Sequence, residues 1–354
     1  MPTTVASLAE LTTLHLGGPA RRLVRAPDRD AIVAAVREAD AAGERLLVLG
    51  GGSNLVVPDD GFDGTVVRLE SRGHVVSPAA DGTALVTVEA GEDWDTFVAA
   101  CVEEGLGGLE CLSGIPGSTG ATPVQNVGAY GVEVADLLED VTVFDRAADA
   151  VVTVPAAELG LGYRTSRLKG ADREIVLAVR FRVGTDGLSA PVRYAELARV
   201  LDVEPGTRVP AAAARAAVLG LRRGKGMVLD EADHDTWSAG SFFTNPVVGQ
   251  ETADEVARRV AARDLGPVTA WPTADGRVKL SAAALIERAG VSRGYPGPDA
   301  PVRVSTRHTL ALTHRGGGTT AQLLDLARDV RDRVETAFGV RLVPEPVLVG
   351  GCAL

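Results

Sequence analysis

Residues 45–54, RLLVLGGGSN, place three consecutive glycines directly after a short apolar run that is typical of a buried strand. Because glycine has no Cβ, backbone N–H groups can closely approach an anion such as a pyrophosphate at this point. The stretch lacks the G-x-G-x-x-G dinucleotide pattern, since position 55 is Leu and the next residues alternate like a strand. No G-K-[ST] follows, which excludes a P-loop. The structural alternative for this cluster alone is a tight turn between two strands.

A second glycine-rich segment follows at residues 113–131, SGIPGSTGATPVQNVGAYG. It combines small residues with uncharged polar side chains, which suits a neutral backbone wall around a flat polar ligand. A flavin ring needs N–H donors and C=O acceptors at its pyrimidine edge, close enough that large side chains would clash. The alternative is a long structural loop.

The rest of the chain mixes helices and strands without the regular alternation of a doubly wound sheet, which favours an α+β architecture. Helical periodicity predicts helices at 28–42, 93–105, 250–263, 281–289 and 319–337. Apolar and alternating runs predict strands at 45–50, around a turn within 55–69, at 83–90, throughout the β-rich stretch 132–185, and at 303–313.

Composition limits the class of protein. The chain has 354 residues, 45% of them hydrophobic, which is enough for two or three compact units. A net charge of −11 disfavours nucleic acid and anionic membranes as partners. We expect no membrane insertion, since no run of about 20 residues is apolar and uncharged. The N-terminus does not resemble a signal peptide, so we expect a cytoplasmic protein.

The three cysteines, Cys101, Cys111 and Cys352, show no metal-pair spacing. Their odd number also argues against a disulfide framework and for a reducing compartment. There is no H-E-x-x-H and no pair of histidines four residues apart, so we expect no metal site. The absence of G-x-S-x-G disfavours a serine hydrolase.

Three short stretches contain candidate reactive groups: Arg164 in GYRTSRLK, Ser241 in WSAGSFFTNP and Glu345 in RLVPEPVLVG. Such a set suits protonation of a carbanion beside a carboxylate, because arginine binds carboxylates in a bidentate way and serine can hand over a proton. Each stretch also has a structural reading: a solvated basic turn, a serine bonded to its own backbone, and an edge-strand carboxylate facing water. Nothing in the sequence shows that the three meet.

Five motifs in order, GGGSN, GATPVQNVGAYG, YRTSRLK, AGSFFTNP and PEP, resemble the UDP-N-acetylenolpyruvoylglucosamine reductases, the MurB family. The resemblance covers nearly the whole chain. It implies an α+β vanillyl-alcohol-oxidase/PCMH-type fold that binds FAD in two subdomains, at 1–70 and 71–220, before a substrate-binding domain at 221–354. RYAEL, near a tyrosine loop expected at 190–200, places the chain with the tyrosine-bearing type I members.

The resemblance also assigns residues to roles. The catalytic residues would be Arg164, Ser241 and Glu345. The flavin would be held by Gly50, Gly51, Gly52, Ser53, Asn54, Gly114, Gly117, Ser118, Gly120, Ala121, Gln125, Asn126, Gly128, Ala129 and Tyr130. The nucleotide sugar would be held by Tyr163, Tyr194, Arg222, Lys225 and Asn245. The 225–241 link looks longer than in some relatives.

The implied reaction converts UDP-N-acetylglucosamine enolpyruvate to UDP-N-acetylmuramate for peptidoglycan. NADPH reduces the flavin and leaves, flavin N5 then gives a hydride to the enolpyruvyl methylene, and Ser241 protonates the neighbouring carbon. Lys225 is the expected source of positive charge for the serine.

One alternative is another FAD oxidoreductase of this fold acting on a sugar or lactone, with Cys111 as a conceivable flavin tether. Another is a flavin- or nucleotide-sugar-binding module without activity. We expect a monomer or weak oligomer.

Overall fold

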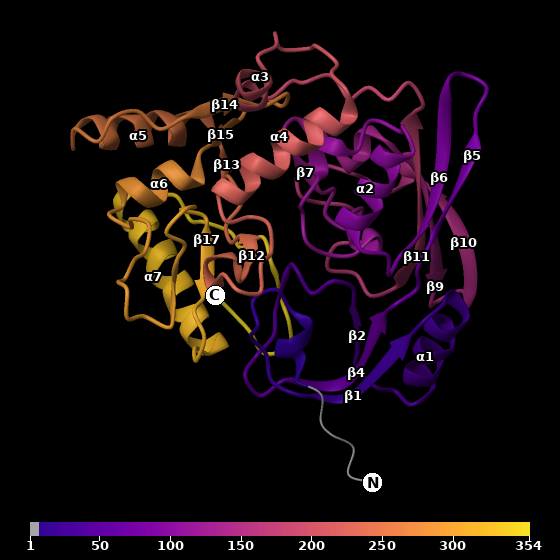
Figure 1. Ribbon diagram of the computed structural model, residues 1–354. Helices are drawn as coiled ribbons and strands as arrows, with labels where there is room; N and C mark the ends of the chain where they lie inside the picture. The colour runs from indigo at the N-terminus through magenta and orange to yellow at the C-terminus, as the bar shows by residue number, and fades with distance from the viewer. Residues whose placement is uncertain (1–6) are drawn as a thin grey trace. The chain divides into compact units, whose positions relative to one another are not determined.

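The structure is a computed structural model that describes residues 7–354 (Figure 1). The chain forms two compact units. Unit 1 contains residues 20–52 and 62–228, and unit 2 contains residues 7–19, 53–61 and 229–354. Each unit has its own hydrophobic core.

Unit 1 combines a small parallel sheet with a larger antiparallel one. Its strands are β1 Ala20–Ala26, β2 Leu46–Leu49, β4 Phe62–Leu69, β5 His74–Pro78, β6 Thr83–Glu89, β7 Gly128–Ala129, β8 Val132–Glu133, β9 Leu138–Asp145, β10 Ala150–Pro155 and β11 Glu174–Gly184. Its α-helices are α1 Arg29–Ala41, α2 Trp94–Glu103, α3 Ala195–Leu201 and α4 Ala211–Gly224.

The parallel sheet has the order β1-β4-β2, and α1 crosses from β1 to β2, as parallel pairing requires. The antiparallel sheet has the order β10-β9-β11-β6-β5. Its central strand β11 is almost continuously apolar and buried. Trp94 and Phe181 pack with ring centroids 5.8 Å apart, so α2 is anchored on that strand. The first glycine-rich segment follows β2 in the chain, and the second follows α2.

Unit 2 contains short strands and three α-helices. The strands are β3 Leu55–Val56, β12 Ser238–Ser241, β13 Val247–Val248, β14 Ala270–Pro272, β15 Val278–Leu280, β16 Val302–Val304, β17 Ala311–His314 and β18 Val347–Leu348. The helices are α5 Gln250–Ala261, α6 Ala282–Arg288 and α7 Thr320–Phe338. The sheets have the orders β12-β17-β16, β13-β15-β14 and β18-β3.

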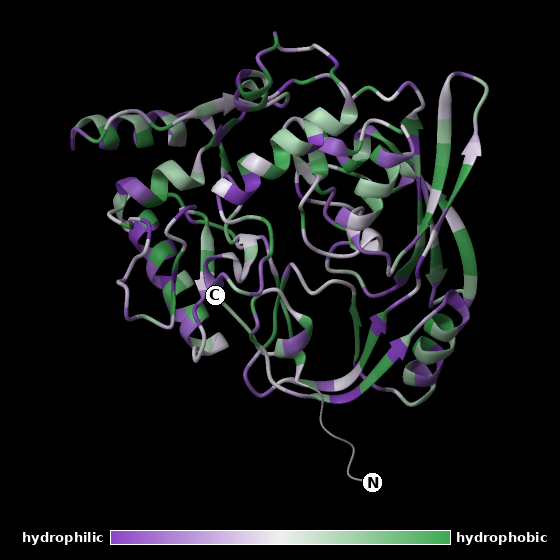
Figure 2. Ribbon diagram, viewed as in Figure 1, coloured by the Kyte–Doolittle hydropathy of each residue, from purple (hydrophilic) through white to green (hydrophobic). Residues whose placement is uncertain are grey.

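Helix α7 supports unit 2. Thr319 and Gln322 form a capping box at its start, and Gly339 ends it in the left-handed region. Asp59 accepts hydrogen bonds from the backbone N–H groups of Thr320 and Ala321, at 2.7 and 2.9 Å, which places a carboxylate at the positive end of the helix. Figure 2 shows hydrophobic and hydrophilic residues alternating around this helix. Its apolar side belongs to the core of unit 2.

Most of the predicted elements are confirmed, because helix α1, strand β2, helix α2, strands β9 to β11 and helices α5 to α7 lie where periodicity indicates. The single strand predicted at 303–313 is wrong. Strands β16 and β17 pair antiparallel, and residues 305–310 form the loop between them. Hydrogen bonds from Ser305 and Thr306 to the buried carboxylate of Asp235 hold this loop out of the ladder. No helix within residues 7–354 is long and apolar enough to cross a membrane.

Candidate active site

The two glycine-rich segments meet in unit 1, backbone against backbone. A Cβ on Gly50 would lie 2.2 Å from Ser118 Oγ, and a Cβ on Gly51 would lie 2.3 Å from the Gly117 Cα. At Gly51 the obstacle is backbone and leaves no room for a side chain, whereas at Gly50 it is the Ser118 hydroxyl. The glycines therefore serve first to let the two segments touch, and the backbone groups that remain are available to a ligand.

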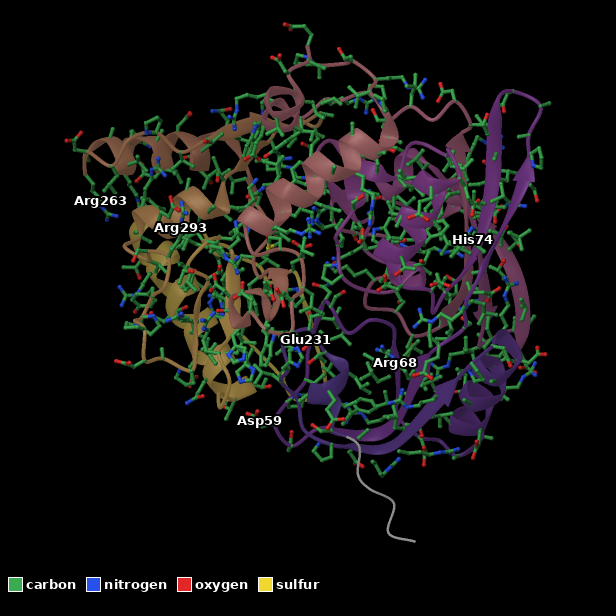
Figure 3. The ribbon with its side chains drawn as sticks, viewed as in Figure 1. Asp59, Arg68, His74, Glu231, Arg263 and Arg293 are labelled. Atoms are coloured by element: carbon green, nitrogen blue, oxygen red, sulfur yellow. The ribbon has the colours of Figure 1, made fainter. Side chains whose placement is uncertain are left out.

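A hydroxyl and an arginine at this junction suit a polar, anionic cofactor. Ser118 Oγ is buried and has no hydrogen-bond partner among residues 7–354. Arg68 on β4, labelled in Figure 3, donates to the Gly50 carbonyl, while its buried Nε has no partner in the described part of the chain. Burial lowers the pKa of Arg68. A buried N–H and a buried hydroxyl without partners cost free energy unless something satisfies them, so these residues fit the expected FAD.

The second segment is fixed at its start by Asp95, a residue that sequence reasoning did not identify. Asp95 accepts the Gly114 N–H at 2.6 Å and pairs with Arg215 at 2.5 and 2.9 Å. Burial raises the pKa of Asp95, but the hydrogen bonds from Arg215 and Gly114 outweigh it, and the net pKa is lowered. Further along, a Cβ on Gly120 would lie 2.5 Å from the Ala90 Cβ. The segment is thus held to α2, α4 and the residue after β6.

The side chain of Asn126 is used within the protein. Its amide nitrogen donates to Glu133 Oε2 at 2.8 Å and to the Gly162 carbonyl at 3.2 Å, and its oxygen accepts the Ala135 N–H at 2.9 Å. Asn126 thereby ties the glycine-rich segment to the turn that precedes Arg164. Other expected flavin residues lie before and after Asn126 in the same segment. Gly120 and Ala121 are in a short 3-10 turn, Gln125 is half-buried, and Gly128 and Ala129 form β7.

Arg164 has a left-handed backbone, with φ of +53°, which is uncommon for a residue other than glycine. Its guanidinium donates to the Gly128 carbonyl at 2.8 Å. Lys169 Nζ donates to the Arg164 carbonyl at 3.0 Å. The guanidinium carbon lies 5.5 Å from the ring centroid of the exposed Tyr163. Arg164 is therefore folded onto the glycine-rich segment, whereas Tyr163, Thr165 and Arg167 of the same stretch are exposed.

Lys225 and Tyr194, both expected at the substrate, form a cluster in unit 1 with Tyr130, expected at the flavin, and with Glu196, which was not predicted. Lys225 Nζ lies 2.6 Å from Glu196 Oε2 and 5.7 Å from the centroid of the Tyr130 ring. Tyr130 and Tyr194 meet edge to face at 5.4 Å. Burial lowers the pKa of Lys225, but the hydrogen bond to Glu196 and neighbouring charges outweigh it, so the net pKa is raised and the ammonium is favoured. Tyr194 immediately precedes α3, which begins within the expected tyrosine loop.

Arg222 lies one turn before Lys225 at the end of α4, and its guanidinium is buried. It donates to the Met227 carbonyl at 2.7 Å, and its Nε has no partner among the residues from 7 onwards. Burial lowers the pKa of Arg222 to about 10. A Cβ on Gly114 would lie 3.4 Å from that Nε, so Arg222 sits against the second glycine-rich segment.

In unit 2 the structure brings the motifs of Ser241 and Glu345 together. The Glu345 N–H donates to the carbonyl of Phe242, the residue after Ser241, at 2.9 Å. The last residue of GGGSN joins them, since Asn54 Nδ2 donates to the Glu345 carbonyl at 3.4 Å and the Asn54 carbonyl accepts the Val347 N–H at 2.9 Å. Arg164 belongs to the other unit.

Two further contacts complete the description of unit 2. Asn245 Oδ1 accepts the Ala282 N–H at 2.9 Å and so supports the start of α6. Ser241 Oγ lies 3.4 Å from His308 Nε2. His308 was not predicted as a site residue, and no spacing in the sequence signals it, because 67 residues separate it from Ser241.

The thiol of Cys111 is fully buried in the core of unit 1, and burial raises its pKa to about 12. A cysteine forms a covalent link to flavin as an accessible thiolate. The conceivable tether at Cys111 is therefore not supported.

The glycine junction of unit 1 suits a flavoprotein, and a family model described as an FAD binding domain matches residues 20–154. A second model, the C-terminal domain of UDP-N-acetylenolpyruvoylglucosamine reductase, matches residues 231–349.

Similar proteins extend this likeness to the whole chain. The chain is 63% identical to a UDP-N-acetylenolpyruvoylglucosamine reductase of Saccharopolyspora erythraea, over 100% of this chain and 97% of the relative. It is 59% identical to that of Nocardia farcinica, over 97% and 88%. The structure of the Thermus caldophilus enzyme superposes with a TM-score of 0.65 at 25% identity, over 97% of each chain.

The chain therefore belongs to the UDP-N-acetylenolpyruvoylglucosamine reductase family. It is an oxidoreductase of peptidoglycan synthesis that uses FAD and NADPH, as expected from the motifs. The alternatives of a sugar or lactone oxidoreductase and of an inactive binding module are not supported.

Proposed function

We propose that Ser241, Glu345 and Arg164 perform the chemical step on the enolpyruvyl group of the nucleotide sugar. Bound FAD would supply the hydride, with NADPH as its reductant. Hydride addition to the methylene carbon leaves negative charge on the neighbouring carbon and its carboxylate. Ser241 Oγ–H protonates that carbon, while the Arg164 guanidinium and a protonated or proton-sharing Glu345 stabilise the developing charge.

The roles of the other residues follow from their chemistry. Tyr163, Tyr194, Arg222, Lys225 and Asn245 are assigned to the nucleotide sugar. Lys225 suits a phosphate because its ammonium form is favoured, and its contacts with Glu196 and Tyr130 position it. The residues of both glycine-rich segments are assigned to FAD. The division into subdomains at 1–70 and 71–220, a cytoplasmic location and a monomer or weak oligomer are part of the same proposal.

The observation that carries this mechanism is the hydrogen bond between the Glu345 N–H and the Phe242 carbonyl, at 2.9 Å. It holds the carboxylate-bearing residue beside the serine motif, although 104 positions separate Ser241 from Glu345 in the chain (345 minus 241). The sequence alone left open whether these two motifs meet.

The test is anaerobic visible spectroscopy of the purified protein with its flavin. NADPH should bleach the flavin, and UDP-N-acetylglucosamine enolpyruvate should restore the colour. In Ser241→Ala, bleaching should keep its rate, while recolouring should slow by roughly a hundredfold or more, as expected for loss of a proton donor. Equal rates of recolouring in the variant and the original protein would remove Ser241 from the mechanism. If NADPH bleaches the flavin but this sugar does not restore the colour, the proposed substrate is wrong.

A further inference from the structure

The loop that follows β16 brings a histidine to the proposed proton donor. Ser241, the last residue of β12, pairs with Ala311 of β17. Just beyond that pair, the Phe242 N–H donates to the Leu310 carbonyl at 2.7 Å. These contacts hold the strand end of Ser241 against the loop 305–310, and His308 Nε2 reaches to 3.4 Å from Ser241 Oγ.

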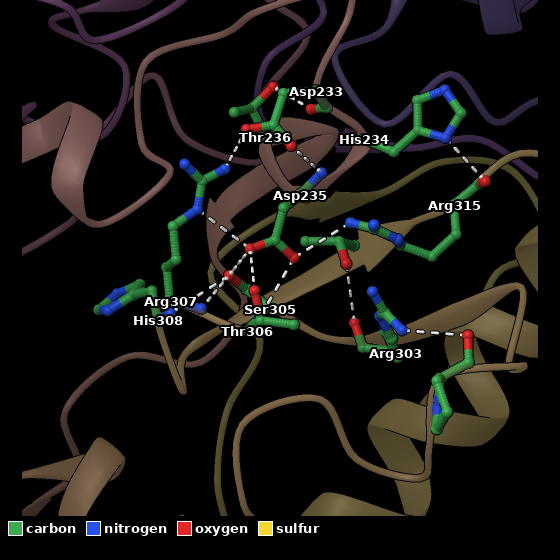
Figure 4. A network of polar contacts seen from close by, with 12 residues as sticks. Asp233, His234, Asp235, Thr236, Arg303, Ser305, Thr306, Arg307, His308 and Arg315 are labelled. Atoms are coloured by element: carbon green, nitrogen blue, oxygen red, sulfur yellow. Dashed lines mark hydrogen bonds and ion pairs between the residues drawn. The ribbon is translucent and has the colours of Figure 1, made fainter.

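Asp235 anchors the loop 305–310, as Figure 4 shows. The buried Asp235 carboxylate accepts hydrogen bonds from Ser305 Oγ at 3.0 Å and from Thr306 Oγ1 at 2.8 Å, and Arg307 and Arg315 pair with it at 3.2 and 3.1 Å. Burial alone raises the pKa of Asp235, but these donors outweigh it and the net pKa is lowered. The carboxylate is therefore a fixed acceptor.

Ser305 connects the Asp235 carboxylate to the backbone of His308. Its Oγ donates to Asp235 and accepts the backbone N–H groups of Arg307 at 3.0 Å and His308 at 3.2 Å. In addition, the Ala311 N–H donates to the His308 carbonyl at 3.0 Å. The backbone of His308 is thus fixed on both sides by hydrogen bonds. A histidine held in this way can keep one ring nitrogen directed at one acceptor.

A serine hydroxyl is a weak acid, so a serine that gives its proton to carbon needs a source for the replacement. Imidazole is the side chain best suited to proton transfer near neutral pH. Serine and histidine at hydrogen-bond distance form the pair that nucleophilic enzymes use to move a proton to or from a hydroxyl. Such contacts are often long before substrate is bound and shorten in the reacting complex.

We propose that His308 is a positioning residue that orients the Ser241 hydroxyl and replaces the proton which Ser241 gives to the substrate. In this step the Oγ–H bond of Ser241 breaks as the new C–H bond forms. His308 gives the replacement proton from its protonated ring: its Nε2–H bond breaks as a new Oγ–H bond forms on Ser241, and the ring is left neutral. The neutral imidazole then regains a proton from hydronium or a buffer acid in the solvent. The inference rests on the proposed role of Ser241.

The test compares His308→Gln and His308→Ala with the full-length flavoprotein in the two half-reactions. Glutamine can bond Ser241 through its amide but cannot relay a proton, whereas alanine can do neither. In both variants we expect bleaching by NADPH within about twofold of the original rate. Recolouring by the nucleotide sugar should be slower by roughly tenfold to a hundredfold, and added imidazole should accelerate His308→Ala. His74→Gln, a substitution in unit 1 at the pair with Glu104, is the matched control and should leave both rates unchanged.

The double variant Ser241→Ala/His308→Gln distinguishes a relay from a structural contact. If His308 acts through Ser241, the double variant should recolour no more slowly than Ser241→Ala alone. Recolouring of His308→Gln at the original rate, or losses that multiply in the double variant, would overturn the inference. The original protein tests the proposed function separately: if the sugar does not recolour it, the proposed function fails and the role of His308 fails with it.

Discussion

Gly51 and Gly117 approach so closely that a Cβ on Gly51 would lie 2.3 Å from the Gly117 Cα and 2.6 Å from its carbonyl carbon. Because the contact is with backbone, no side-chain rotation can relieve it. The two glycine-rich segments of unit 1 therefore depend on each other for their shape.

Gly51→Ala should separate the two segments and weaken FAD binding by roughly tenfold or more, which corresponds to about 1.4 kcal/mol. The ratio of flavin to protein absorbance after purification, followed by titration with FAD, measures this loss. Gly220→Ala is the control, because a Cβ there meets nothing within 4 Å and the residue lies in helix α4. It should keep its flavin and gain stability, by up to about 1 kcal/mol. Full flavin occupancy in Gly51→Ala would contradict the close packing.

Asp95→Ala should destabilise the protein by about 2 kcal/mol, because the partly buried guanidinium of Arg215 and the Gly114 N–H lose their acceptor. Since Gly114 begins the second glycine-rich segment, FAD affinity should fall as well. Urea unfolding followed by circular dichroism, with and without added FAD, measures both effects. The control is Asp149→Asn, at an exposed pair with Arg37, where we expect a change below about 1 kcal/mol. A similar loss in the two variants would mean that the Asp95 contacts add no more than a surface pair.

Local features of the fold could be predicted from the sequence, because they depend on neighbouring residues. The strand that ends at Leu49 and the helix predicted at 319–337 are such features, and both predictions are confirmed. Contacts between distant positions could not be predicted. The distance between Ser241 and His308 depends on the loop 305–310, which the alternating pattern wrongly placed in a strand. The loop forms because Asp235 is buried beneath it, and the sequence does not reveal which of its many carboxylates is buried.

Lys225→Gln should raise the KM for the nucleotide sugar by roughly tenfold, with a smaller effect on kcat, if Lys225 contacts a substrate phosphate. The ammonium lies within a polar cluster beside Glu196 and Tyr130, so the amide removes charge without leaving an apolar gap. Steady-state kinetics at two salt concentrations measures the effect, and the salt dependence of KM should be smaller in the variant. Arg223→Gln changes the same net charge at the neighbouring exposed position and should leave KM within about twofold. Equal KM values for the two variants would show that Lys225 does not contact the substrate phosphate.

His314 should make the stability of unit 2 depend on pH. Its Nδ1 lies 3.1 Å from the Leu14 carbonyl, and its Nε2 accepts the Gly318 N–H at 3.1 Å. The neutral ring with its proton on Nδ1 satisfies both contacts, whereas a proton on Nε2 would oppose the Gly318 N–H. Burial, together with the charges of His15 and His234, lowers the pKa of His314 below 6.5, and the Leu14 carbonyl only partly opposes this.

Because the folded-state pKa is the lower one, the unfolded chain takes up the proton first as the pH falls. The contribution of His314 is therefore complete above pH 6.5 and is lost as the pH falls through its pKa in the folded protein. Urea unfolding of the full-length protein in steps from neutral to mildly acidic pH measures this. His314→Gln, which can still accept the Gly318 N–H, should be less stable at neutral pH by about 1–2 kcal/mol, and the difference should shrink as the pH falls. A difference between the two proteins that stays constant over that range would show that the ring is not held neutral by the fold.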